Sequence, residues 1–211
     1  MDLLLFLDYA GTLAFALSGA ALAIEKRFDI VGALALALSA GLAGGIIRDV
    51  LTDRLPPAAF QTGTYLFLCI AATIIAAFPS LIQKFEKPRE FFDAAGLGLF
   101  CVVGAATAID AGLSIIPATF IGAISACGGG VLRDVLTQRT PEVFTPSGLY
   151  LIPAAGGSLF VAIASGWDIG QETSAAIVVP AVFAIRLASI RFGWRTKAFG
   201  TRSNSDDGSK P

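Results

Sequence analysis

Two short stretches of the 211-residue chain place glycines beside an arginine–aspartate pair. "GGIIRD" spans residues 44–49, and "GGGVLRD" spans residues 128–134. Each glycine lowers helix stability by about 1 kcal/mol relative to alanine, so paired or triple glycines favour a kink or break. A charged side chain in apolar surroundings is costly unless it is paired or hydrated. This combination is typical of a transport or conduction pathway, although close helix packing also uses glycine.

The two pairs, Arg48–Asp49 and Arg133–Asp134, leave several roles open. Adjacent side chains on a helix do not face each other, so pairing across helices is as reasonable as local pairing. The arginines could also anchor helix ends by extending to the membrane interface. Otherwise these four residues are expected to line or gate a pathway, with Gly44, Gly45, Gly128, Gly129 and Gly130 as its helix breaks.

Weaker candidates for the pathway also occur in pairs. Thr62 and Ser147 could offer hydroxyl groups to an ion, or they could serve helix packing. Tyr65 and Tyr150 could line the pathway or belong to an interfacial aromatic belt.

Three isolated charges receive structural interpretations. Asp8 and Asp93 begin apolar segments and are interpreted as helix caps. Arg186 interrupts the last apolar segment and is expected to extend toward the interface.

The composition indicates an integral membrane protein. Hydrophobic residues make up 55% of the chain and charged residues 15%, against about 25% charged in soluble domains. The sequence contains no histidine, and Cys69, Cys101 and Cys127 lie in apolar runs without metal-site spacing. No nucleophile–base set, cofactor motif or basic–aromatic nucleic-acid patch is recognisable. We therefore expect no enzyme, no cofactor, no bound metal and no nucleic-acid partner.

Continuous apolar runs predict an all-α membrane protein with seven transmembrane helices. About 20 apolar residues are needed to cross the membrane, and backbone groups in lipid must be paired within a helix. The predicted spans are 4–24, 30–51, 59–82, 92–110, 113–136, 146–166 and 174–192.

The distribution of basic residues predicts the orientation. Of the fifteen Lys and Arg residues, all except Arg48 and Arg54 fall on the side opposite the N-terminus. By the positive-inside rule that side is cytoplasmic. The expected location is the inner (plasma) membrane, with the N-terminus outside and the C-terminus in the cytoplasm.

The chain also repeats itself at an offset of 85 residues. Residues 8–66 align with residues 93–151 without a gap, and R-D-V-L-T-x-R-x-P occurs in both copies. Each copy contains three spans, an odd number, so the second must enter the membrane from the opposite side. The predicted architecture is an inverted 3+3 repeat plus one extra helix.

These boundaries define a single transmembrane domain over residues 1–196. Repeat one covers about 5–83, repeat two about 90–166 and the seventh helix about 174–192. Residues 197–211 are polar and are expected to form a disordered cytoplasmic tail.

The twin glycine–arginine–aspartate motifs within an inverted repeat resemble the prokaryotic branch of the trimeric intracellular cation (TRIC) channel family. The resemblance covers about residues 5–192. It implies a homotrimer in membrane lipid, with one pore per subunit that conducts potassium and to some extent sodium. It also implies that the glycine-containing spans border the pore. In the first copy Ala43 replaces the first of the three glycines.

The expected function is therefore a monovalent cation channel that is mainly permeable to potassium. The alternative is a small-solute secondary transporter, for example for glycine. Inverted repeats with broken helices are common in such transporters, where helix N-termini can hold a carboxylate.

Overall fold

The computed structural model describes residues 2–78, 85, 87–146, 149–167 and 169–196. Its elements are eight α-helices and one short 3-10 helix within these residues. Five of the helices are long and apolar enough to cross a membrane: α1 (Leu3–Glu25), α2 (Ile30–Leu51), α6 (Pro88–Asp110), α7 (Ile115–Leu136) and α9 (Gln171–Phe192). Two apolar helices are shorter, namely α4 (Thr64–Ala76) and α8 (Leu151–Gly166). The predicted all-α membrane architecture is confirmed.

The long helices begin and end at recognisable capping residues. Asp29 accepts a hydrogen bond from the Gly32 N–H at 2.7 Å and starts α2. Proline occupies the first position of α6, where its missing N–H costs nothing. Gly193 adopts the left-handed conformation that terminates α9. Most helix boundaries therefore fall within a few residues of the predicted ones.

The third and sixth predicted spans are the exceptions. The predicted helix over 59–82 is divided into α3 (Ala58–Gln61) and α4, because Thr62 is extended and cannot continue the helical hydrogen bonds. The helix predicted over 146–166 is shorter than expected, because α8 begins only at Leu151. A short 3-10 helix, η1 (Glu142–Phe144), precedes it. Residues 79–82 of the third predicted span and the predicted tail over 197–211 lie outside the described residues.

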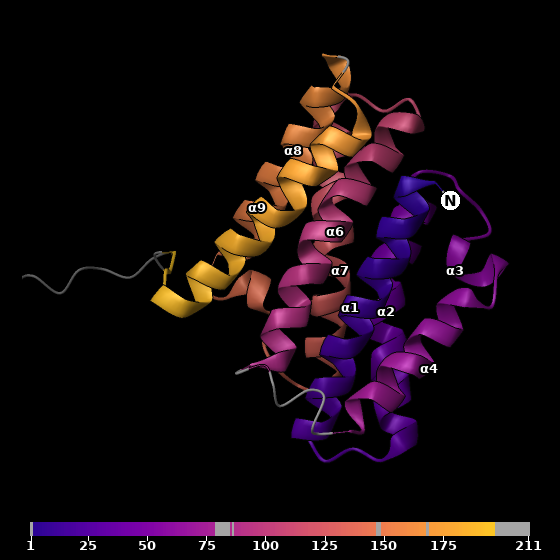
Figure 1. The fold of residues 1–211 in the computed structure, drawn as a ribbon, viewed down its shortest axis with the longest axis vertical. Coiled ribbons are helices and arrows are strands. Elements are labelled where there is room, and N and C mark those ends of the chain that lie inside the picture. Colours follow the sequence, from indigo (N-terminus) through magenta and orange to yellow (C-terminus); the bar gives the residue numbers. More distant parts are fainter. Residues whose placement is uncertain (1, 79–84, 86, 147–148, 168, 197–211) are drawn as a thin grey trace, which may run out of the picture.

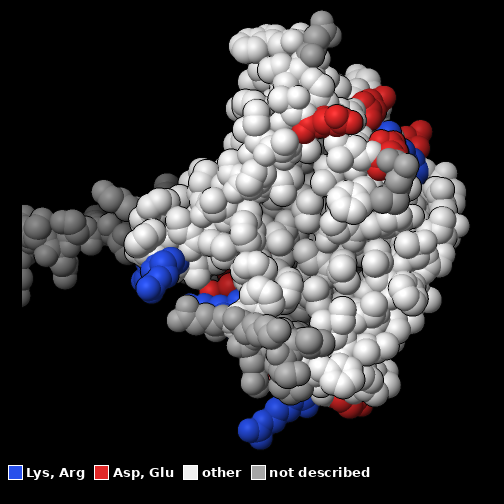
Figure 2. Space-filling model, viewed as in Figure 1, with Lys and Arg blue, Asp and Glu red and all other residues white. Residues whose placement is uncertain are grey.

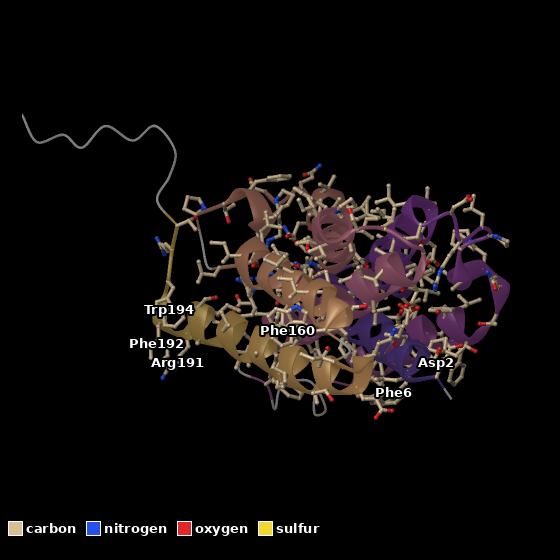
Figure 3. The ribbon with its side chains drawn as sticks, turned by 90° about the horizontal axis from the view of Figure 1, so that it is seen from above. Asp2, Phe6, Phe160, Arg191, Phe192 and Trp194 are labelled. Carbon is tan, nitrogen blue, oxygen red and sulfur yellow. The ribbon has the colours of Figure 1, made fainter. Side chains whose placement is uncertain are left out.

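Four helices form the centre of the molecule: α1, α2, α6 and α7 (Figure 1). α4 packs against α1 and α2 on one side. On the other side α8 packs against α6 and α7, and α9 packs against α6 and α8. In Figure 3 the end of α9, marked by Arg191 and Trp194, lies across the molecule from Asp2 at the start of α1. The two repeats thus meet in the centre, and their third helices lie outside.

Aromatic rings join the two repeats where α1 and α6 cross. The rings of Phe15 and Phe100 are fully buried, with centroids 5.4 Å apart. Phe15 lies against Gly96, and Phe100 lies against Gly11, where a side chain would overlap the ring. Each ring and each glycine has its counterpart 85 residues away. The contact is therefore reciprocal, as an inverted repeat requires.

Candidate functional site

The first arginine–aspartate pair belongs to a buried network that joins three helices. Arg48, in the last turn of α2, donates from Nη1 to Asp8 Oδ1 of α1 at 2.6 Å. Its Nε donates to Asp49 Oδ1 at 2.8 Å. The Tyr65 hydroxyl of α4 donates to Asp8 Oδ2 at 2.6 Å. The guanidinium is therefore held by two carboxylates, which offsets the large cost of burying its charge.

The second pair forms the same network in the other repeat. Arg133 of α7 donates from Nη1 to Asp93 Oδ1 of α6 at 2.7 Å and from Nε to Asp134 Oδ1 at 2.9 Å. The Tyr150 hydroxyl, just before α8, donates to Asp93 Oδ1 at 3.2 Å. Arg133 is completely buried. Each member matches its counterpart at the offset of 85 residues, so the inverted repeat carries two equivalent charged networks.

Both ways of pairing that the sequence left open occur together. Each arginine contacts its neighbouring aspartate and also reaches an aspartate forty residues away on another helix. The arginines are buried, so the alternative of an interfacial anchor is wrong for Arg48 and Arg133.

Asp8 and Asp93 do not cap helices, contrary to the sequence interpretation. Asp8 lies inside α1, whose cap is Asp2, and Asp93 lies inside α6 after Lys87 as the capping position. Both aspartates are buried partners of the arginines. The signal that could have revealed them was present, because they form the first matched pair of the repeat.

The ends of α2 and α7 share a backbone arrangement that fixes the arginine–aspartate pair in the last turn. Asp53 and Gln138 have positive φ values of 56° and 57°. In α2 the following amide, Arg54 N–H, donates to the Asp49 carbonyl at 2.8 Å. In α7 the Arg139 N–H donates to the Asp134 carbonyl at 2.9 Å in the same way. This left-handed ending satisfies a free carbonyl and stops each helix directly after the motif.

The glycines do not interrupt their helices. α2 and α7 are continuous α-helices through Gly44 and Gly45 and through Gly128–Gly130, so the predicted helix break is wrong. Gly44 lies against the Ser125 carbonyl oxygen, and Gly129 lies against the Ala40 carbonyl oxygen, at positions that a Cβ would occupy. The missing side chains let the two helix backbones touch where α2 crosses α7.

Of the other residues that the sequence predicted for the pathway, some belong to the networks and others lie away from them. Tyr65 and Tyr150 are buried members of the networks. Gly130 makes room for the Tyr150 hydroxyl, whereas Gly45 has only Arg48 Nη2 near its missing Cβ, at 3.8 Å. Thr62 is exposed in the extended link between α3 and α4. Ser147 lies outside the described residues.

The network around Arg48 faces a hollow of about 370 Å³. Asp8, Arg48, Asp49 and Tyr65 form part of its wall, and the rest comes from residues that include Leu4, Ala58, Val103, Asp110 and Arg54. Val103 and Asp110 belong to α6 of the other repeat. The first network can therefore meet solvent or an ion at the end of the molecule where α1 begins.

Three further charged side chains surround the network of Arg133, and the sequence did not predict their contacts. Glu142 Oε1 accepts from Arg89 Nη1 at 2.9 Å, and Glu142 Oε2 pairs with Arg186 Nη2. The Arg186 guanidinium lies 4.7 Å from the centroid of the Tyr150 ring. Arg186 is buried rather than extended to the interface, because Glu142 neutralises it inside the protein.

The environment of Glu142 favours its charged form. Burial alone would raise the pKa of this carboxyl group, but Arg186 and Arg89 outweigh that effect and lower its pKa below the ordinary value. Glu142 therefore stays ionised as the anion between two guanidinium groups.

Comparison with known proteins identifies the family. A family model described as "Glycine transporter" matches residues 5–80 and again residues 90–165, which are the two repeats. Solved structures of TRIC cation channels superimpose on nearly the whole chain. One, the TRIC orthologue from Rhodobacter sphaeroides, has a TM-score of 0.84 at 28% identity and covers 92% of this chain and 100% of its own. The chain belongs to the TRIC channel family.

Other relatives support this TRIC assignment. A second TRIC cation channel structure has a TM-score of 0.83 at 30% identity and covers 96% of this chain and 100% of its own. The UPF0126 membrane protein of Streptomyces coelicolor is 41% identical over 90% of this chain and 88% of its own length. The UPF0126 inner membrane protein of Escherichia coli K12 is 29% identical over 96% and 99%, respectively. Relatives described as membrane proteins thus match this TRIC-family chain over most of its length.

Proposed function

We propose that the protein is a monovalent cation channel, mainly permeable to potassium and to some extent to sodium, with one pore in each subunit of a homotrimer. The observation that carries the proposal is the pair of Asp–Arg–Asp networks, one in each repeat. In each network two carboxylates surround one guanidinium. The network around Arg48, which faces the hollow, sums formally to one negative charge and attracts cations although an arginine is present. Around Arg133 the same negative charge is offset by Arg89, Glu142 and Arg186, which together add one positive charge.

The structural relatives add the ion class and the assembly. They are described as TRIC cation channels, one of them as a trimeric channel orthologue, and one was crystallised in 0.5 M KCl. The likeness extends over 90% or more of this chain in each case. These relatives support the same ion class and trimeric assembly for this protein.

A small-solute transporter is the less favoured alternative. Its support is the description of the family model as a glycine transporter. Against it, α2 and α7 are unbroken, so they offer no half-helix N-terminus at mid-membrane to hold a carboxylate. The solved relatives are described as channels.

We further propose the inner membrane as the location, with the N-terminus outside and the C-terminus in the cytoplasm. An Escherichia coli relative is described as an inner membrane protein. On the face shown in Figure 2, acidic side chains gather mainly at the end where α1 begins, and most basic ones lie toward the other end. This distribution agrees with the positive-inside rule.

Reconstitution in a planar bilayer tests the channel. With a KCl gradient, we expect unitary currents whose reversal potential lies near that of potassium and far from that of chloride. Saturable glycine uptake into liposomes without unitary currents would show that the transporter alternative is correct.

A further inference from the structure

The surroundings of Arg48 in the first repeat differ from those of Arg133 in the second, although the two arginines occupy equivalent positions. Around Arg48 the structure leaves a hollow, and the wall of that hollow includes Leu4 of α1 and Val103 of α6. The residues 85 positions away are Arg89 and Ser18. Arg89 and Ser18 both belong to the polar contacts around Arg133. Apolar wall residues in one half thus correspond to hydrogen-bonding residues in the other.

These residues form a continuous set of contacts over the second network. Ser18 Oγ accepts from Arg133 Nη1 and donates to the Arg89 carbonyl at 2.9 Å. The Arg89 side chain then reaches Glu142. Glu142 pairs in turn with Arg186, whose Nη1 donates to the Leu149 carbonyl at 3.4 Å. The set links α1, α6, η1 and α9.

None of the three charged residues has a charged counterpart in the first repeat. Arg89 corresponds to Leu4, Glu142 corresponds to Pro57, and Arg186 lies on α9, outside the repeat. The first half therefore cannot form the same set of contacts. The inverted repeat makes two equivalent networks, and these added charges surround only the second.

We propose that Arg89, Glu142 and Arg186 form the barrier that closes the half-pathway of Arg133, and that separating Glu142 from Arg186 opens it. The inference rests on the proposed channel function and assigns it a closing element. Glu142 is the key member, because one carboxylate holds two guanidinium groups together. Without its charge, Arg186 loses its anion and the two arginines repel each other.

Single-channel recording of Glu142→Gln and Arg186→Gln tests the barrier. We expect a several-fold higher open probability for both variants, with the unitary potassium conductance unchanged. Matched controls are Glu172→Gln, which makes the same change on the exposed start of α9, and Arg191→Gln, which neutralises an exposed arginine five residues beyond Arg186. Unchanged opening in both test variants, with wild-type thermal stability, would refute the barrier.

A labelling experiment tests the barrier without relying on currents. Ser18→Cys, made with Cys69, Cys101 and Cys127 replaced by alanine, places one thiol beneath the proposed barrier. We expect a membrane-impermeant thiol reagent, added from the side of Arg191, to label this cysteine faster when Glu142→Gln is also present. Equal labelling rates would contradict the barrier even if the wild type conducts potassium. Absence of wild-type current with faster labelling would instead refute the channel and leave the barrier standing.

Glu142→Asp serves as the second variant if Glu142→Gln does not fold. The shorter carboxylate keeps the charge but cannot span the distance to both arginines equally. We expect an open probability between those of wild type and Arg186→Gln, and a value identical to wild type would count against the barrier.

Discussion

Arg48 and Asp8 are separated by forty residues in sequence, yet Arg48 Nη1 lies 2.6 Å from Asp8 Oδ1 in the buried contact between α1 and α2. Removing one partner of a buried ion pair leaves the other charge uncompensated, at a cost of about 3–5 kcal/mol. Asp49 still pairs with Arg48 at 2.8 Å in the Asp8→Asn variant, so we expect the free energy of unfolding in detergent to fall by less than this, by about 1.5–3 kcal/mol for the lost charged hydrogen bond. A double-mutant cycle with Arg48→Gln measures the coupling, and strictly additive losses would contradict the pairing.

The Tyr65 hydroxyl supplies a further hydrogen bond to the same carboxylate. A hydrogen bond to a charged group contributes about 1.5–3 kcal/mol, so Tyr65→Phe should lower the free energy of unfolding by that order. Tyr9→Phe is a suitable control, because the Tyr9 ring packs edge-on against Tyr65 with centroids 5.0 Å apart. Equal losses for both variants would mean that the hydroxyl bond contributes nothing specific.

The same substitution by alanine should have opposite effects on stability at Gly44 and at Gly45 of α2. Gly44→Ala places a methyl group on the Ser125 carbonyl, so α2 and α7 must separate. Overpacking of this kind costs about 1–3 kcal/mol. Gly45→Ala meets only Arg48 Nη2, at 3.8 Å, and should stabilise the helix by up to about 1 kcal/mol. Thermal unfolding of the two variants provides the comparison, and a Gly44→Ala variant as stable as Gly45→Ala would refute the contact.

The charge state of Glu142 determines how the protein responds to acid. Its pKa is lowered in the folded state, so its stabilising contribution is complete above the unfolded value of about 4.3 and is lost as the pH falls through the lower folded value. The stability difference between wild type and Glu142→Gln should therefore be constant from about pH 8 to pH 5 and shrink only in stronger acid. A difference that already shrinks between pH 7 and pH 6 would contradict the arginine pairing.

The sequence predicted the helices, the inverted repeat and the arginine–aspartate motifs, because these depend on local patterns and on an internal comparison. It did not predict the partner of each arginine. Asp8 could equally have capped α1, and only the crossing of α1 with α2 brings it to Arg48. Similarly, glycines that weaken a helix are the same glycines that permit close packing, and the tertiary contact decides between the two.

The contacts of Arg89, Glu142 and Arg186 could not be predicted from the sequence for a different reason. Glu142 lies in a short polar connection and Arg186 lies alone in an apolar helix, so neither belongs to a repeated motif. The only signal was the departure from the repeat, where Leu4 and Pro57 correspond to Arg89 and Glu142.

Gly44 contacts Ser125, and Gly129 contacts Ala40 in the same way, so the two halves of the chain behave like the two partners of an isologous dimer fused into one polypeptide. In a two-fold homodimer, one substitution changes both sides of the interface at once. Here the halves are encoded separately, so each crossing glycine can change alone, but its surroundings always belong to the other half. Neither half can therefore evolve independently at this crossing, although the surrounding charges have already diverged.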